Sequence, residues 1–176
     1  MISKHFTATL DYMRRTPDCG VCGCKLVHSS GEVQDSCRRF PFLRFKIVNV
    51  LTGYSKHHAF PQRWKRKLEK INHSQFYVNK REGKEAFEVD YLIGACQMIR
   101  REVIAKVGEL DEKIFYGPED ADYCLRARRA GWKVCYLPYV SFIHDYQRVT
   151  NRNFFTGMGA KHLKALLYFW WKYKRC

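Results

Sequence analysis

Acidic residues are scarce in this chain. Asp and Glu together account for 17 of its 176 residues, against 32 for Lys and Arg, and the formal net charge is +15 at pH 7. A surface of this sign favours anionic partners, namely phosphates, nucleic acids or acidic lipid headgroups. The scarcity also draws attention to any short stretch in which several carboxylates stand together.

Long apolar runs are missing as well. No stretch of about 18 or more apolar residues occurs, so we expect no bilayer-spanning helix. The opening residues, MISKHFTATLDYMRR, are polar and lack the apolar core of a secretory signal. Because 46% of the residues are hydrophobic and 15% are aromatic, the chain is globular in composition. We therefore expect a cytoplasmic protein with reduced thiols.

The eight cysteines lack the spacing of a metal site. Three of them lie in CGVCGC, residues 19–24, but no second CxxC and no pair of His residues stands at the spacing of a zinc site. Zinc binding and a buried strand of small residues are the two interpretations of this stretch. The strand is the favoured one.

Periodicity and breakers predict an alternation of strands and helices. Helices are expected over 3–15, from Arg100 to Gly108, and over 119–131, the last two ending at a glycine. Strands are expected over 21–27 and 132–138, with an edge hairpin over 33–41. Within 86–99 we expect an apolar strand that enters Gly94-Ala95-Cys96, followed by a second short strand. This order predicts an α/β fold with a mixed sheet and flanking helices.

Two segments are rich in basic residues. Residues 42–85 begin with a helical rhythm and then become dense in Lys, Arg and His, which predicts a basic insertion or mobile loop. This segment is either a solvated surface or one that faces an acceptor or a membrane. Residues 146–176 are predicted to form an amphipathic helical tail, which either packs on the domain or lies in an anionic membrane interface. Its apolar face comprises Leu163, Leu166, Leu167 and Trp170.

Three of the few carboxylates stand within four positions, at Glu119, Asp120 and Asp122. Acids in the first turn of a helix are favoured by the helix dipole, by about 0.3–1 kcal/mol each. However, three neighbouring carboxylates repel one another, and such crowding raises a carboxyl pKa toward neutrality. Asp120 and Glu119 are therefore candidates for a general base that deprotonates a hydroxyl.

Two further positions have the character of a ligand site. His144 ends the apolar strand YVSFIH, and open α/β sheets bind ligands at the carboxyl ends of their strands. It either contacts a metal or a phosphate, or forms a structural hydrogen bond at the sheet rim. Gly94 and Ala95 are small residues at a strand end, where a ligand can approach the backbone closely.

Several ordered motifs together resemble one family. GACQMIRRE, DEKIFYGPEDADYCLRARRAG and FIH, in this order, are similar to the C-terminal half of family 2 glycosyltransferases with the GT-A fold, especially the rhamnosyltransferase-like bacterial members. MRRTPDCGVCGCKLVHSSGEVQDSCRRFP is similar to the segment that follows their metal-binding DxD motif. The resemblance covers most of the chain and is weakest over 42–85.

The resemblance implies an inverting transfer of a sugar from a nucleotide-sugar to an acceptor hydroxyl, with rhamnose as the family-level choice of sugar. The implied acceptor is a glycan or a lipid-linked molecule in surface polysaccharide synthesis. Its implied site consists of Asp120 as the base, Glu119, Asp122 and Tyr116 as support or acceptor contacts, Gly94 and Ala95 beside the donor sugar, and His144 at the metal or diphosphate. A divalent cation, Mg²⁺ or Mn²⁺, would neutralise the leaving diphosphate. A peripheral position at the inner face of the plasma membrane would suit a lipid-linked acceptor.

The chain also departs from the family pattern, because no nucleotide-binding first half ending in a DxD motif precedes the segments that match. We therefore interpret residues 1–145 as the C-terminal half of a GT-A domain, a partial fold expected to bind nucleotide-sugars poorly by itself and to be inactive without the donor-binding half. The alternatives are a non-catalytic remnant or binding module, and a basic nucleic-acid-binding protein. Nucleic acid is not the expected partner, since no helix-turn-helix, RNP or zinc-finger pattern occurs.

Overall fold

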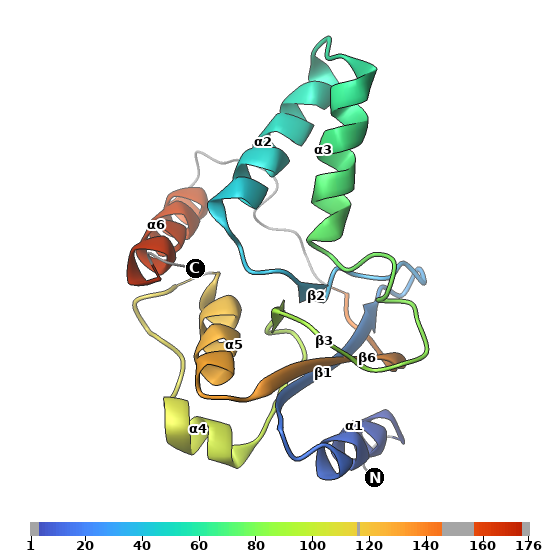
Figure 1. The fold of residues 1–176 in the computed structure, drawn as a ribbon, viewed down its shortest axis with the longest axis vertical. Helices are drawn as coiled ribbons and strands as arrows, with labels where there is room; N and C mark the ends of the chain where they lie inside the picture. Colours follow the sequence, from blue (N-terminus) through green and yellow to red (C-terminus); the bar gives the residue numbers. More distant parts are fainter. Residues whose placement is uncertain (1–3, 116, 146–156, 174–176) are drawn as a thin grey trace.

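The computed structural model describes residues 4–115, 117–145 and 157–173. The helices are α1 (Lys4–Arg15), α2 (Leu43–His57), α3 (Gln62–Ser74), α4 (Arg101–Val107), α5 (Glu119–Arg129) and α6 (Gly157–Lys172). The strands are β1 (Cys19–Val27), β2 (Cys37–Arg38), β3 (Phe87–Glu88), β4 (Tyr91–Leu92), β5 (Met98–Ile99) and β6 (Lys133–Ile143). Figure 1 shows their arrangement.

Two long strands, β1 and β6, run parallel through the centre of the main sheet and place Cys22 opposite Cys135. The strand order is β3-β6-β1-β5, and both outer strands run antiparallel to their neighbours. The sheet is therefore mixed, and helices flank it (Figure 1). The predicted α/β class is confirmed.

Each face of this sheet packs into its own apolar cluster. On one face, Cys22, Cys24 and Leu26 of β1 pack with Leu137 of β6 and with Met13 of α1. The other face contributes to a larger cluster that also takes in buried residues of α4, α5 and α6. The alternation of side chains along a strand explains why β1 serves both clusters. The strand interpretation of CGVCGC is confirmed, and all three of its cysteines are buried.

Close packing at Gly20 leads to a stability prediction. A Cβ atom at Gly20 would lie 2.6 Å from Cβ of Trp132 and 2.7 Å from Cγ2 of Val103. We expect Gly20→Ala to lower the free energy of unfolding by roughly 1–3 kcal/mol, the usual cost of overpacking a core. Urea unfolding measures the change. Gly53→Ala on α2 is the control, because its Cβ would meet nothing within 4 Å, and an undiminished stability of Gly20→Ala would contradict the prediction.

The second short strand predicted within 86–99 is present as β5, but the apolar strand predicted before it is wrong in detail, since two two-residue strands, β3 and β4, take its place. β3 pairs with β6, β4 pairs with β2 in a separate two-stranded sheet, and β5 pairs with β1. Asp90, between β3 and β4, accepts hydrogen bonds from the backbone N–H of Phe40 at 3.0 Å and from the hydroxyl of Tyr77 at 3.3 Å. These polar contacts hold the bend that separates the two strands.

Two other strand predictions also change. The edge hairpin predicted over 33–41 forms only in part: Val33 makes an isolated antiparallel bridge with Val27, whereas the strand in this range, β2, pairs with β4. The predicted strands WKVCYLP and YVSFIH are one continuous strand, β6, which ends at Ile143 and has a register shift in which Cys24 faces Leu137 and Lys25 faces Ser141. Pro138 has no N–H to donate, so it fits at such an irregularity of the ladder.

The mobile-loop alternative for residues 42–85 is wrong for most of the range, because α2 and α3 form a helical hairpin there. The hairpin extends away from the sheet, at the end of the molecule opposite to α1 and α4 (Figure 1). Its buried side chains are Phe45, Val48, Thr52 and Ser55 on α2 and Leu68 on α3. Within the described ranges, no helix has the length and apolar character needed to cross a bilayer.

The predicted helical tail is present as α6. Its predicted apolar face divides, because Leu166 is buried in the core whereas Leu163 and Leu167 are exposed. Nε1 of Trp170 donates a hydrogen bond of 2.8 Å to the carbonyl oxygen of Pro41, just before α2. The packing alternative therefore holds for one side of α6.

Candidate active site

Asp120 lies in the first turn of α5, beside the turn that joins β4 to β5. Its Oδ2 accepts a hydrogen bond from the backbone N–H of Gly94 at 3.2 Å, and its Oδ1 accepts one from the N–H of Ala121 at 2.7 Å. The structure thus brings together Asp120 and Gly94, two residues that were both predicted to belong to the site.

A pocket of about 620 Å³ opens at this contact. Its lining combines the β4–β5 turn, the end of α4 and the start of α5, and consists of Gly94, Gln97, Ile99, Ile104, Glu109, Leu110, Glu119, Asp120 and Tyr123. Oε2 of Glu119 and the hydroxyl of Tyr123 are buried without a hydrogen-bond partner among the described residues. Buried polar atoms are normally paired, so these two are candidates to bond a ligand.

The environment raises the pKa of Asp120 to about 6. Burial is the main cause, because it disfavours the charged form, and the negative charge of Glu119 adds to it. Hydrogen bonds from Ala121 and Gly94 and the positive charge of Arg38 act in the opposite direction. A carboxylate with such a pKa is largely ionised at pH 7 and still able to accept a proton, as a general base requires.

Two basic residues near Asp120 were not among the predicted site residues. The pKa of Arg38 on β2 is raised, with Tyr91 and Asp120 among the groups that raise it. The pKa of Lys46 on α2 is lowered, by burial first and then by the charge of Arg38, while the charge of Asp120 acts in the opposite direction. The RRFP stretch contains Arg38, but no local pattern shows that it folds back to α5.

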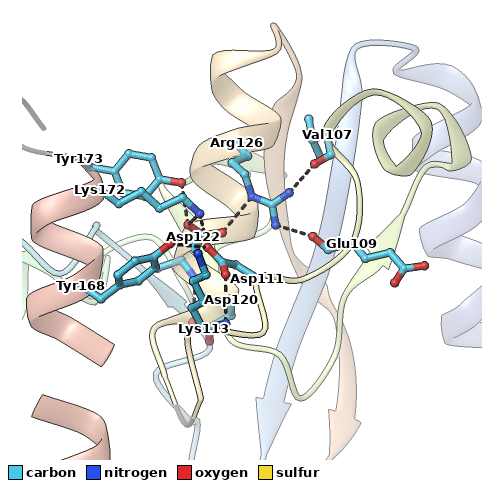
Figure 2. A network of polar contacts seen from close by, with 11 residues as sticks. Val107, Glu109, Asp111, Lys113, Asp120, Asp122, Arg126, Tyr168, Lys172 and Tyr173 are labelled. Carbon is cyan, nitrogen blue, oxygen red and sulfur yellow. Dashed lines mark hydrogen bonds and ion pairs between the residues drawn. The ribbon is translucent and has the colours of Figure 1, made fainter. Parts of the chain in front are cut away.

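Asp122 faces away from the pocket and is fully buried. Its Oδ2 accepts a hydrogen bond from Nε of Arg126 at 2.9 Å, and its Oδ1 accepts one from Nζ of Lys172 at 2.7 Å and one from the hydroxyl of Tyr173 at 2.6 Å. Figure 2 shows Lys172 at the end of α6, and Tyr173 just after it, reaching Asp122 on α5. Its burial and its three partners favour the supporting role predicted for Asp122 over a direct contact with the acceptor.

The remaining predicted site residues do not line the pocket or lie outside the described residues. Ala95 is exposed in the same turn as Gly94 but does not line the pocket, and Tyr116 lies outside the described residues. His144 follows β6, where its Nδ1 lies 3.0 Å from Oε1 of Gln34. That contact matches the structural alternative for His144, and the pocket lining does not include it.

At sites that bind phosphates, Mg²⁺ is usually held by one or two carboxylates together with the substrate phosphates. Across residues 4–115, 117–145 and 157–173, no group of three or more His, Cys, Asp or Glu side chains is placed to hold a metal ion. The described residues therefore form no metal site from protein ligands alone, and the Mg²⁺ or Mn²⁺ that the family resemblance implies stays a prediction.

Comparisons with known proteins agree with the resemblance. The sequence model of the family described as Glycosyltransferase like family 2 matches residues 3–160. N-acetylglucosaminyl-diphospho-decaprenol L-rhamnosyltransferase of Mycobacterium tuberculosis (strain ATCC 25618 / H37Rv) is 27% identical over 172 residues, which are 94% of this chain and 52% of that protein. Rhamnosyltransferase WbbL of Escherichia coli (strain K12) is 30% identical over 130 residues, 74% of this chain and 42% of that protein.

The chain spans about half the length of the M. tuberculosis relative. A shorter match, 35% identical over 57 residues, links it to the low-salt glycan biosynthesis hexosyltransferase Agl10 of Haloferax volcanii and covers 32% of this chain and 19% of that protein. The family match extends over all the segments that build the pocket. The chain belongs to the family 2 glycosyltransferases and is rhamnosyltransferase-like.

Proposed function

We propose that this chain carries the catalytic base of an inverting sugar transfer, with Asp120 in that role. The observation that carries the proposal is the Asp120 carboxylate, whose pKa is raised to about 6, in a pocket that also holds the unpaired polar atoms of Glu119 and Tyr123. Hydroxyl groups of a sugar could satisfy both of these atoms. The donor is a nucleotide-sugar, with rhamnose as the sugar.

In the proposed reaction, the acceptor hydroxyl lies within hydrogen-bond reach of the Asp120 carboxylate. Its oxygen attacks the anomeric carbon of the donor while Asp120 takes its proton, and the bond between that carbon and the diphosphate oxygen breaks. The nucleoside diphosphate leaves with the bonding electrons. Attack from the side opposite to the leaving group inverts the anomeric configuration. The hydrogen bonds from Gly94 and Ala121 hold the carboxylate in place.

The acceptor in this proposal is a glycan or a lipid-linked molecule of surface polysaccharide synthesis. The name of the M. tuberculosis relative specifies an N-acetylglucosaminyl-diphospho-decaprenol substrate, so a lipid diphosphate that carries N-acetylglucosamine is the first acceptor to test. A peripheral position at the cytoplasmic face of a membrane suits such an acceptor. A divalent cation and a contact from His144 to the cation or the diphosphate stay predictions.

A transfer assay tests this function. Radiolabelled dTDP-rhamnose is incubated with N-acetylglucosaminyl-diphospho-polyprenol, and labelled lipid is extracted, with UDP-glucose as the control donor. Because the chain spans about half the length of the relative, both the 176-residue chain and any longer protein that contains it are assayed. We expect label in the lipid from the rhamnose donor. The absence of labelled lipid with both the 176-residue chain and the longer protein would favour the non-catalytic alternative.

Gly94 provides a test of the donor contact. A Cβ atom at Gly94 would meet nothing within 4 Å, and the residue lines the pocket. We expect Gly94→Val to narrow the pocket and lower kcat/KM for the donor about tenfold or more, equivalent to roughly 1.4 kcal/mol of binding, with little change in Tm. Ala95→Val is the matched control in the same turn. An equal loss in both variants would contradict a specific role for Gly94.

A further inference from the structure

The α2–α3 hairpin has an apolar surface that the fold leaves uncovered. On α2, Leu43, Ile47, Val50, Leu51 and Tyr54 are between 39% and 68% exposed. Their spacing of four, three, one and three residues puts them on one side of the helix over three turns. We call these five residues the outer stripe. It lies apart from Phe45, Val48, Thr52 and Ser55, the residues of α2 that are buried.

The same hairpin is strongly basic. Residues 43–74 contain a single acid, Glu69, and eight basic side chains, namely Arg44, Lys46, Lys56, Arg63, Lys65, Arg66, Lys67 and Lys70. Trp64 on α3 is about half exposed and lies under two of these cations, with Cζ of Arg63 at 5.8 Å and Nζ of Lys67 at 5.4 Å from the ring centroid. Tryptophan and basic residues beside an aliphatic face are typical of helices that lie in a membrane interface.

We propose that the α2–α3 hairpin docks the protein on an anionic lipid bilayer, with the outer stripe in the headgroup and acyl boundary and the cations of α3 on the lipid phosphates. The hairpin stands out from the rest of the molecule (Figure 1), so it can approach a surface without obstruction from the sheet. The charge of the hairpin complements acidic headgroups, each basic side chain near such a surface contributing about 1 kcal/mol.

Other partners fit these observations less well. A nucleic acid would be attracted by the cations but would have no use for exposed Leu, Ile and Val side chains. A second copy of the chain carries the same net charge of +15 and would be repelled. The bilayer offers both the negative charge and the apolar interior.

Docking on a membrane would bring the pocket to a lipid-linked acceptor. In this respect the inference rests on the proposed function. The start of α2 is close to the pocket, because the charge of Asp120 acts on Lys46 and partly offsets the lowering of its pKa by burial and by Arg38. A hairpin seated on the bilayer would therefore keep the base near the membrane surface, where the diphosphate and sugar of such an acceptor are located.

Vesicle flotation with the 176-residue chain tests the proposal without any transfer reaction. The probes are phosphatidylcholine vesicles with and without about 30% phosphatidylglycerol. We expect binding to the anionic vesicles that weakens as salt is raised, and at least tenfold weaker binding to pure phosphatidylcholine. Asp120→Asn should bind as wild type does, so a failure of the proposed function and a failure of membrane docking give different results.

Two variants of the hairpin separate the contributions of the outer stripe and of the α3 cations to vesicle binding. The stripe variant combines Ile47→Gln, Val50→Gln and Leu51→Gln, and the charge variant combines Arg66→Gln, Lys67→Gln and Lys70→Gln. We expect each to weaken binding to anionic vesicles roughly tenfold to 100-fold with a Tm close to that of wild type.

Matched controls lie elsewhere on the molecule. Arg14→Gln, Arg15→Gln and Arg101→Gln remove three cations from α1 and α4, at the opposite end (Figure 1). Leu163→Gln, Leu167→Gln and Trp171→Gln remove the other exposed apolar row, which lies on α6. Both controls should retain vesicle binding.

Four results would overturn the proposal. The first is equal binding to neutral and anionic vesicles, and the second is loss of binding in the α6 variant with normal binding in the stripe variant. The third is a stripe variant that binds vesicles normally but converts a dimer into a monomer in light scattering, which would make the stripe a protein contact. Salt-dependent binding to duplex DNA without binding to vesicles would equally contradict it and favour nucleic acid.

Discussion

Asp120→Asn is expected to lower the rate of sugar transfer roughly 10²- to 10⁴-fold, the usual contribution of a general base. The amide has nearly the shape of the carboxylate and keeps an oxygen that can accept the hydrogen bond from Gly94 or from Ala121. It cannot take the proton of the acceptor hydroxyl. The loss should appear in kcat with little change in KM for the donor, and steady-state kinetics in an active form of the enzyme measure both.

The effect of Asp120→Asn on the stability of the fold should depend on pH. Because burial and Glu119 raise the pKa of Asp120 to about 6, above about 3.9 for an unfolded Asp, the fold favours the protonated carboxyl. The stability that this group contributes is fully present below about pH 4 and is lost as the pH rises through about 6. Relative to wild type, Asp120→Asn should therefore gain stability between about pH 4 and pH 8, by up to roughly 3 kcal/mol, since each pKa unit corresponds to about 1.4 kcal/mol.

Glu119→Gln tests the cause of the raised pKa. Removing the negative charge of Glu119 should lower the pKa of Asp120 and shift the acidic limb of the pH–rate profile to lower pH. Glu112→Gln, an exposed position that does not line the pocket, is the control. Unchanged transfer in Asp120→Asn would remove Asp120 from the role of base, whatever the pH profiles show.

Asp122→Asn is expected to destabilise the fold by about 3–5 kcal/mol, the cost of removing one partner from a buried ion pair. The fully buried carboxylate accepts hydrogen bonds from Arg126, Lys172 and Tyr173. Without its charge, Arg126 and Lys172 each lose an ion-pair partner in a region of low polarity. Because Asp122 lies on α5 and Lys172 on α6, the variant should loosen the contact between these helices, and urea unfolding measures the loss.

Asp111→Asn is the matched control for Asp122→Asn. Asp111 is also a partner of Lys172, with Oδ2 at 2.6 Å from Nζ, but it is partly exposed. The hydrogen bond from Lys172 lowers the pKa of Asp111, so its contribution to stability is lost as the pH falls. We expect a loss of about 1 kcal/mol or less. If Asp122→Asn were as mild as Asp111→Asn, the network would not hold α6 in place.

The double variant of Asp122→Asn with Lys172→Met measures the interaction energy between these two side chains. Methionine removes the cation that Asp122→Asn leaves without its buried partner, so the double variant should be less destabilised than the sum of the two single variants. A coupling energy near zero would show that the two side chains contribute independently.

Local sequence was sufficient for several features. Gly108 and Gly131 follow α4 and α5 with φ of +76° and +94°, a backbone region that favours glycine, so the helix ends could be predicted from neighbouring residues alone. The cluster of three acids at the start of α5 and the buried strand CGVCGC depend equally on short-range patterns. By contrast, residues 86–99 form three short strands because each pairs with a different, distant strand, and no local pattern contains that information.

The sequence by itself determined that Glu119, Asp120 and Asp122 stand together at the start of a helix in a family 2 glycosyltransferase. Only the tertiary structure decided which of them belongs to the pocket. Residues two apart on an α-helix point in nearly opposite directions, so Asp120 meets Gly94, 26 residues away, while Asp122 meets Lys172, 50 residues away. Asp120 thereby lies in the pocket with a raised pKa, and Asp122 is neutralised by its partners, because packing against distant segments sets the environment of each charge.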